Sequence, residues 1–300
     1  MQESVSGETN KTDHLEPGDL GSDWKNIAIP HPEKIIFPEL GLRRLEIVAY
    51  YDEVSPIMLP HLEGRALTLT RWPQGIEGPQ FYQRHPTPNA PLLISNRADL
   101  LRWVGRGAVE FHAPLGLWTN PLSHDWAVLD LDPSPELPWA NVREASEIVG
   151  EFLRLCGIAY GLKTSGKRGV HFFIRIKPTD QRRTVYWMRC LATLLSESFP
   201  DLFSVERLKI RRGTRIYLDY LQNSGARSMA AIFSLRATPT ASVSTPVTLE
   251  GLQHPPEYWT PARILGRWAH LDEIWQGCAE LVDLGRIMHE RKLLRPDAGF

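Results

Sequence analysis

A run of eight residues, from Trp126 to Pro133, most constrains what this chain can fold into and do. Apolar or small residues lead into Asp130 and Asp132, and a proline follows at once, which is the pattern of a buried strand that ends in acid. Residues two apart in a strand point to the same face, about 6.6 Å apart. Anions held this close persist mainly where a cation lies between them. The motif favours a divalent metal that binds phosphate oxygens, with an ordinary strand that ends in acidic loop residues as the alternative.

The chain has the composition of a globular protein, but its charges are unevenly distributed. Its 300 residues carry a formal net charge of −1, whereas the segment from Lys163 to Arg189 holds eight lysines and arginines against one aspartate. A polyanion such as nucleic acid would bind to such a basic segment. No stretch is apolar and long enough to cross a membrane. The three cysteines form no close pair, which argues against a disulfide framework or a CxxC-type zinc site and fits a reducing cytoplasm.

The chain divides into a polar leader and one two-lobed domain. Residues 1–23 are acidic and lack the basic start and apolar core of a signal peptide, so we expect a disordered leader. We predict a single domain over 24–300. It comprises an N-terminal lobe at 24–121, a catalytic lobe at 122–255 and a C-terminal helical cap at 256–300.

The apolar spacing of the catalytic lobe predicts elements in the order β-α-β-β-α-β. One helix is expected from an N-cap at Asn141 to Gly157, and a second from Asp180 to Ser198. Strands after the acidic one are expected at 159–163, 170–176 and 215–219. This is the split βαβ arrangement of ferredoxin-like and RNA-recognition-motif-like (RRM-like) folds, in which the first strand lies between the third and the fourth. The predicted fold class is therefore α+β, an RRM-like sheet packed with a second mixed α/β lobe and C-terminal helices.

Three carboxylates and one glycine-rich turn indicate what this sheet does. Asp219 ends the last strand of the predicted sheet, so it lies on a strand next to that of Asp130 and Asp132. The turn from Ser165 to Gly169 offers backbone N–H groups, a hydroxyl and two cations to phosphate oxygens. Two-metal nucleotidyl transfer needs anionic ligands for ions about 3.5 to 4 Å apart. We interpret the aspartates as catalytic metal ligands and the turn as a triphosphate site, with a plain β-hairpin connection as the alternative.

Several motifs in a fixed order resemble those of one family. They are Lys34-Ile-Ile-Phe-Pro38, Val109-Glu-Phe-His-Ala-Pro114, Asp130-Leu-Asp-Pro133, Lys163-Thr-Ser-Gly-Lys-Arg-Gly-Val-His171, Ile216-Tyr-Leu-Asp219 and Phe233-Ser-Leu-Arg236. This combination resembles the polymerase (primase-polymerase) domain of bacterial ATP-dependent DNA ligase D. That domain belongs to the archaeo-eukaryotic primase superfamily and serves non-homologous end joining. The resemblance covers roughly residues 24–275.

The resemblance implies a reaction and the residues that carry it. The reaction is nucleotidyl transfer to a DNA 3′-hydroxyl, preferentially from ribonucleoside triphosphates, in gap filling or overhang extension. Two Mn²⁺ or Mg²⁺ ions would bind Asp130, Asp132 and Asp219. The nucleotide-binding positions that the resemblance implies are Ser165, Arg168, His171, His112, Arg212, Arg215, Gln222, Ser234 and Arg236.

The resemblance also implies contacts to DNA and to other proteins. Lys34 and Arg44 correspond to a pocket for the 5′-phosphate of a downstream strand, and Phe81 and Tyr82 to aromatic residues that stack on DNA. Expected partners are gapped or overhanging DNA ends, Ku and an ATP-dependent DNA ligase, in the nucleoid of a bacterial cytoplasm. Arg44 and Arg168 stand where the family usually has lysine, and an arginine fork is not equivalent to an ammonium.

Two other functions are compatible with the aspartates. A haloacid-dehalogenase-like phosphatase also ends a strand in a DxD motif, but it needs Thr or Val two residues after the second Asp, where this chain has Ser134. The other alternative is a DNA-end-binding module without catalysis. Retention of all three aspartates argues against it, because inactive sites usually lose at least one ligand.

Overall fold

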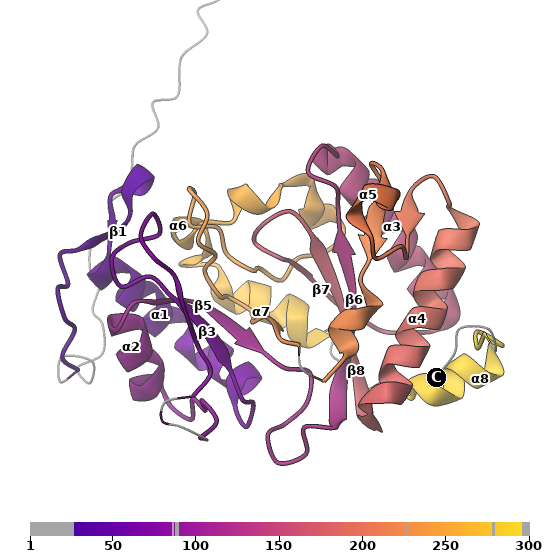
Figure 1. Ribbon diagram of the computed structural model, residues 1–300, viewed down its shortest axis with the longest axis horizontal. Coiled ribbons are helices and arrows are strands. Elements are labelled where there is room, and N and C mark those ends of the chain that lie inside the picture. Colours follow the sequence, from indigo (N-terminus) through magenta and orange to yellow (C-terminus); the bar gives the residue numbers. More distant parts are fainter. Residues whose placement is uncertain (1–26, 86, 88–89, 226, 278–279, 296–300) are drawn as a thin grey trace, which may run out of the picture.

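Two separate sheets organise the molecule and stand side by side (Figure 1). The computed structural model describes residues 27–85, 87, 90–225, 227–277 and 280–295, so the leader predicted at 1–23 lies outside the described residues. A four-stranded sheet has the order β11-β5-β3-β4, and a five-stranded sheet has the order β7-β8-β6-β10-β9. The mixed content and the two sheets confirm the predicted α+β class.

The four-stranded sheet and two helices form the N-terminal lobe. Its strands are β3 (Thr68–Arg71), β4 (Phe81–Gln83), β5 (Ala108–Ala113) and β11 (Met229–Ala230). Its helices are α1 (Arg44–Leu62) and α2 (Arg97–Gly105). A small ribbon precedes them and consists of β1 (Ile35–Phe37), η2 (Pro38–Leu40) and β2 (Leu42–Arg43). The buried hydroxyls of Tyr50 and Tyr51 donate to the carbonyls of Phe233 and Val109. These bonds fix α1 both to its own sheet and to a segment that follows β11.

The five-stranded sheet confirms the predicted neighbours of the acidic strand. Its strands are β6 (Ser123–Asp132), β7 (Gly161–Thr164), β8 (Val170–Asp180), β9 (Phe203–Ser204) and β10 (Ile216–Leu218). The central strand β6 pairs antiparallel with β8 on one side and β10 on the other. Its residues from Ala127 to Leu129 are fully buried, as an apolar run in a central strand should be.

Helices complete the catalytic lobe, and one begins earlier than predicted. The helices here are α3 (Trp139–Cys156), α4 (Gln181–Ser198), α5 (Lys209–Arg212) and η3 (Tyr220–Asn223). The prediction of Asn141 as N-cap was wrong, because Pro138 caps α3. The indole of Trp139, the first residue of α3, donates to the carbonyl of Leu252 at 2.7 Å, and this hydrogen bond anchors the first turn of the helix. The end at Gly157, in the left-handed conformation, is as predicted.

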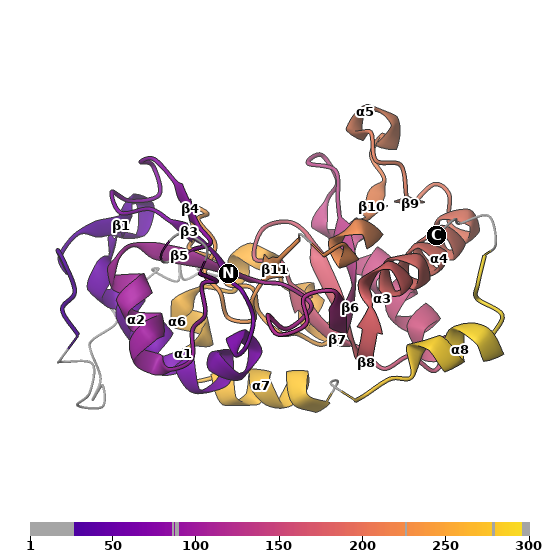
Figure 2. The same ribbon diagram turned by 60° about the horizontal axis from the view of Figure 1, so that its bottom comes forward.

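The last part of the chain runs back along both lobes. It contains η4 (Glu250–Gln253), η5 (Pro256–Tyr258), α6 (Pro261–Ile264), α7 (Trp268–Gly277) and α8 (Leu284–Glu290). Helix α7 contacts both β7 and α1, so it spans the two lobes (Figure 2). β11 likewise joins the N-terminal sheet although it comes late in the chain. No helix among the described residues is long and apolar enough to cross a membrane.

Candidate active site

Strand register brings the three predicted aspartates and His171 to one end of the five-stranded sheet. Asp130 lies opposite His171 in the β6–β8 ladder. Tyr217 lies opposite Asp132 in the β6–β10 ladder, so Asp219 follows directly beside Asp130, and its N–H donates to the Asp130 carbonyl at 2.8 Å. The sequence predicted which strands are neighbours. The register adds that Asp130, Asp219 and His171 lie at the same end of these strands.

The electrostatics of this group show that negative charge is poorly compensated. Burial raises the pKa of Asp130 to about 8, and the charges of Asp219 and Asp132 add to the effect. Burial also raises the pKa of Asp219. A bound cation would reverse both shifts, because opposite charge favours the ionised form of a carboxyl. The site therefore has the electrostatic character of a cation site.

Each outer carboxylate has an arginine nearby. Arg212 Nη1 lies 3.6 Å from Asp132 Oδ2, and Arg227 Nη1 lies 3.8 Å from Asp219 Oδ2. Among the described residues, no three His, Cys, Asp or Glu side chains converge on one point as a metal site would require. By donor type the three carboxylates suit a hard divalent cation. They lie on adjacent strands, but their side chains do not converge.

The glycine-rich turn is built around the hydroxyl of Ser165. This oxygen accepts the N–H of Lys167 at 3.1 Å and that of Gly169 at 3.0 Å. Gly166 has a positive φ of 69°, and a Cβ there would lie 2.5 Å from a side-chain carbon of Arg236, so glycine is required. The buried Arg236 also donates to the Ser165 carbonyl at 2.5 Å. Ser165 and Arg236 thus shape the turn from within.

The turn and two of the three carboxylates line one hollow of about 1140 Å³. Its lining residues include Asp130, Asp132, Ser165, Lys167, Arg168, His171 and Arg236. The side chains of Lys167 and Arg168 are exposed at its edge. Anionic groups on one wall and cations on another suit a metal-bound polyphosphate.

Glu110 organises the cations of this hollow, and the sequence analysis did not identify it as a site residue. His112 Nε2 lies 3.0 Å from its carboxylate, Arg236 Nε 3.3 Å and Lys167 Nζ 3.4 Å. Burial alone would raise the pKa of Glu110, but the hydrogen bond with His112 and the neighbouring cations lower it. The sequence signal that could have identified Glu110 is the alternation of side chains along its strand, which places Glu110 on the same face as His112.

Three predicted nucleotide-binding residues have other contacts in the structure. The hydroxyl of Ser234 is fully buried, accepts the Phe111 N–H at 2.9 Å and donates to the Leu235 carbonyl. Arg215 donates to backbone carbonyls near α5 at Arg212, Arg211 and Pro200. Gln222 donates to Asp219 Oδ2 at 3.1 Å, so it contacts a catalytic carboxylate directly. The first two contacts stabilise the surrounding backbone.

Lys34 and Arg44, which were predicted to bind a 5′-phosphate, line a hollow in the N-terminal lobe together with further cations. A hollow of about 910 Å³ is lined by Lys34, Arg44, Arg71, Arg106, Gln74 and Glu33, among others. Arg44 is buried and donates to the carbonyls of Pro30 and Pro73, so it supports the wall. Lys34 contacts the side chain of Gln74. Arg71 and Arg106 are the cations that the sequence analysis did not assign.

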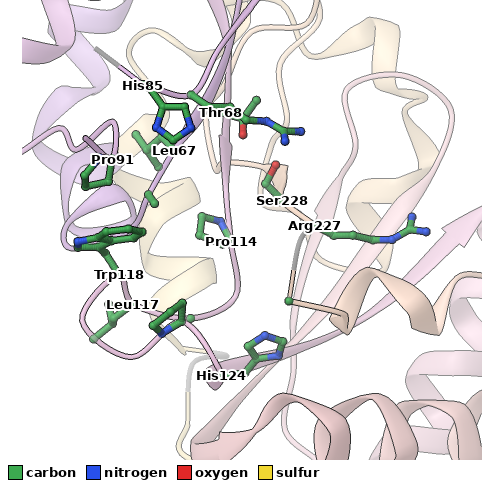
Figure 3. A pocket seen from close by; sticks show the side chains of 15 residues that line it. Leu67, Thr68, His85, Pro91, Pro114, Leu117, Trp118, His124, Arg227 and Ser228 are labelled. Atoms are coloured by element: carbon green, nitrogen blue, oxygen red, sulfur yellow. The ribbon is translucent and has the colours of Figure 1, made fainter. Parts of the chain in front are cut away.

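A third hollow, of about 780 Å³, lies at the seam between the lobes (Figure 3). Leu67, Thr68 and His85 come from the N-terminal lobe, and Arg227 and Ser228 come from the segment before β11. The connection between the lobes contributes Pro114, Gly116, Leu117 and Trp118. Trp118 is 46% exposed. The described lining residues include Arg84 and Arg227 but no carboxylate. Phe81 and Tyr82, 52% and 67% exposed, stand on the nearby edge strand β4.

Comparisons with known proteins agree with this arrangement. The family model described as "LigD, primase-polymerase domain" matches residues 43–96 and 90–275. The multifunctional non-homologous end joining protein LigD of Pseudomonas aeruginosa is 31% identical over 247 residues, which are 75% of this chain and 29% of that protein. LigD of Mycobacterium tuberculosis is 26% identical over 77% of this chain and 34% of that protein. The chain spans about a third of the length of these relatives.

A solved structure shows the same fold. The polymerase domain of Mycobacterium tuberculosis ligase D, in complex with DNA, superposes with a TM-score of 0.74 at 24% identity. The match covers 82% of this chain and 98% of that one. Together with the family model, which matches well over half of the sequence, this shows that the chain belongs to the family of LigD primase-polymerase domains.

Proposed function

We propose that this chain is a DNA-directed nucleotidyltransferase that adds nucleotides, preferentially ribonucleotides, to DNA 3′ ends during non-homologous end joining. The observation that carries the proposal is that Asp130, Asp132 and Asp219 lie at one end of adjacent strands, and that Asp130 and Asp132 share a hollow with the turn at Ser165 to Gly169. Carboxylates next to a cationic turn are what transfer from a nucleoside triphosphate requires. Membership of the primase-polymerase family supports the same reaction.

The carboxylates would hold two divalent cations, Mn²⁺ or Mg²⁺. When bound, the cations would activate the attacking hydroxyl and neutralise charge on the triphosphate and the leaving group. The raised pKa values of Asp130 and Asp219 support this assignment, because burial and neighbouring negative charge outweigh the positive charge near both carboxyls. Arg212 beside Asp132 and Arg227 beside Asp219 would limit the net charge of the site.

The nucleotide would occupy the hollow above the carboxylates. Lys167 and Arg168 at its rim would bind the triphosphate oxygens, and His171 would reach them from the floor. His112 is held in place by Glu110, and its partly exposed ring is a candidate contact for the sugar. Arg236 and Ser165 would act by keeping the turn in shape.

The DNA would lie across the two lobes. The seam hollow joins an exposed indole, Trp118, to Arg84 and Arg227, and Arg227 contacts the catalytic Asp219. An aromatic platform with cations and without acids is typical of single-strand binding sites. Phe81 and Tyr82 would stack on bases, and the pocket around Lys34 would bind the 5′-phosphate of the downstream strand.

The setting of the activity is part of the proposal. The residues 24–300 would act as one two-lobed domain, with Ku and an ATP-dependent ligase as partners at bacterial chromosomal DNA ends in the cytoplasm. Support comes from the relatives, which are non-homologous end joining proteins, and from the fact that this chain spans about a third of their length.

Primer extension on a gapped duplex tests the proposal. The wild type should extend the primer with Mn²⁺, and ribonucleotides should be used with a lower KM than deoxyribonucleotides. Asp132→Ala should abolish extension, whereas Asp201→Asn, at an exposed aspartate on the turn after α4, should leave it unchanged. A wild type that extends no primer, or an Asp132→Ala variant that extends equally well, would show that the proposal is wrong. Phosphate release from a generic phosphomonoester under the same conditions would favour the phosphatase alternative.

A further inference from the structure

A lysine stands in the protein interior directly behind the nucleotide hollow. Lys163, on β7, is only 1% exposed. Within the described part of the chain, its amine has hydrogen-bond contacts with His171 and Ser244 and no carboxylate at ion-pair distance. Burial of an ammonium without a carboxylate partner is costly, and burial accordingly lowers the pKa of the Lys163 amine well below its usual value. A methionine would fill the same space without that cost, which indicates that the amine itself has a role.

The ladder between β7 and β8 sets the position of this amine. Lys163 lies directly opposite His171, so the two side chains share one face of the sheet, and Lys163 Nζ lies 2.8 Å from His171 Nδ1. The amine also donates to Ser244 Oγ at 2.6 Å. The Ser244 hydroxyl uses its single hydrogen on the Thr164 carbonyl at 2.9 Å, so its oxygen can only accept from the lysine. The amine is therefore held at two points.

The imidazole of His171 lies between this lysine and the catalytic carboxylates. Its second nitrogen, Nε2, lies 3.5 Å from Asp130 Oδ1. The 2.8 Å contact fits a lysine N–H that donates to an unprotonated Nδ1, and in that arrangement the ring proton is on Nε2. The N–H of Nε2 then faces Asp130 and the hollow.

We propose that Lys163 is a positioning residue for the incoming nucleotide. From the interior it fixes the ring orientation and the tautomer of His171, so that the Nε2–H is presented to the triphosphate oxygens. The inference rests on the proposed function, in which His171 contacts the triphosphate. Lys163 itself is covered by Ser244, His171 and Phe173 and does not reach the substrate. This arrangement is analogous to the outer partners that orient ligating histidines in metal sites.

The tautomer can be measured without any catalysis. In ¹⁵N-histidine spectra of the metal-free protein, the signals of the His171 ring can be assigned by their loss in His171→Gln. These signals should show a ring that is protonated on Nε2 and unprotonated on Nδ1. Lys163→Met should abolish this fixed tautomer. A wild-type ring protonated on Nδ1, or a tautomer unchanged in Lys163→Met, would overturn the proposal. These spectra report the tautomer of His171 even if the protein extends no primer. A failure of this proposal is therefore distinguishable from a failure of the proposed function.

Kinetics then test what the tautomer does. Lys163→Met should raise the KM for nucleoside triphosphate roughly tenfold, the value of about one hydrogen bond to a charged group, while kcat and the affinity for DNA stay unchanged. The double variant Lys163→Met/His171→Gln should be no worse than His171→Gln alone. A full additional effect in the double variant, or an equal loss of DNA binding, would refute the proposal. If Lys163→Met does not fold, Ser244→Ala should produce a smaller rise in the same KM, and an unchanged KM in that variant would refute it.

Discussion

The buried carboxyl of Asp130 should make the metal-free protein less stable as the pH rises. Its pKa is raised from 3.8 to about 8 by burial and by the neighbouring Asp219 and Asp132. Because the folded protein then binds this proton more tightly than the unfolded chain, the stabilising effect of protonation is fully present below about pH 4. It is lost progressively as the pH rises towards 8.

Replacing Asp130 with asparagine keeps the shape and removes the titrating group. The pKa difference between 3.8 and about 8 is about 4 units, and at 1.36 kcal/mol per unit its ceiling is about 6 kcal/mol. Relaxation and water entry lower such penalties in real proteins. We therefore expect Asp130→Asn to raise the free energy of unfolding by roughly 2–3 kcal/mol at pH 8. Near pH 4 the gain should be close to zero, and the Tm at pH 8 should rise by roughly 4–8 °C.

Denaturant unfolding in the presence of a chelator, from pH 4 to pH 8, provides the measurement. The stability curves of the wild type and Asp130→Asn should diverge with pH, and Asp201→Asn should follow the wild type. Added Mn²⁺ should stabilise the wild type at pH 8 and should stabilise Asp130→Asn less. Parallel curves for the wild type and Asp130→Asn would show that Asp130 titrates normally. The inference that the negative charge of this site is poorly compensated would then be wrong.

Three further predictions concern the DNA surface and the junction of the lobes. Trp118→Ala should weaken binding of a single-stranded overhang by about tenfold or more, as loss of one base stack does, measured by fluorescence anisotropy; equal binding would exclude Trp118 from the DNA path. Arg65→Met would leave Asp125 without the two contacts of 2.9 and 2.6 Å that join the lobes, and should cost about 2 kcal/mol in urea unfolding because Asp125 is partly exposed. Lys34→Ala should abolish the preference for a downstream 5′-phosphate in gap filling, and a preserved preference would remove Lys34 from the pocket.

The arrangement around Asp130 was predictable because it depends on local patterns. An apolar run followed by acid defines β6, and the alternation of helical and extended spacing defines the βαβ order that places β8 and β10 beside it. Register was not predictable, because it depends on which residues of distant strands pair. The pairing of Asp130 with His171 and the bond from Asp219 to the Asp130 carbonyl are properties of the folded sheet alone.

The roles of individual charged residues were harder to predict than their positions. Arg44 looks like a phosphate ligand in the sequence, yet its guanidinium donates to backbone carbonyls. The sequence assigns no site role to Glu110, yet it is buried among His112, Lys167 and Arg236. A charge in a sequence shows only what a residue can bind. The partners of Glu110 include Arg236, more than a hundred residues away in the chain, and only the tertiary structure brings such a pair together.

The two arginines that neighbour the catalytic carboxylates differ in how firmly they are held. Arg212 stacks on Tyr217 at 3.6 Å and donates to two backbone carbonyls, whereas the Arg227 side chain is 42% exposed and faces the seam hollow. A cation that binds Asp219 competes with Arg227, and a DNA phosphate that binds Arg227 releases Asp219. Coupling of this kind is reciprocal. DNA should therefore increase the affinity for Mn²⁺ in the wild type by several-fold, in the range of typical coupling energies, and hardly at all in Arg227→Gln. Equal enhancement in both proteins, measured by Mn²⁺ titration with and without an overhang duplex, would show that Arg227 does not connect the two sites.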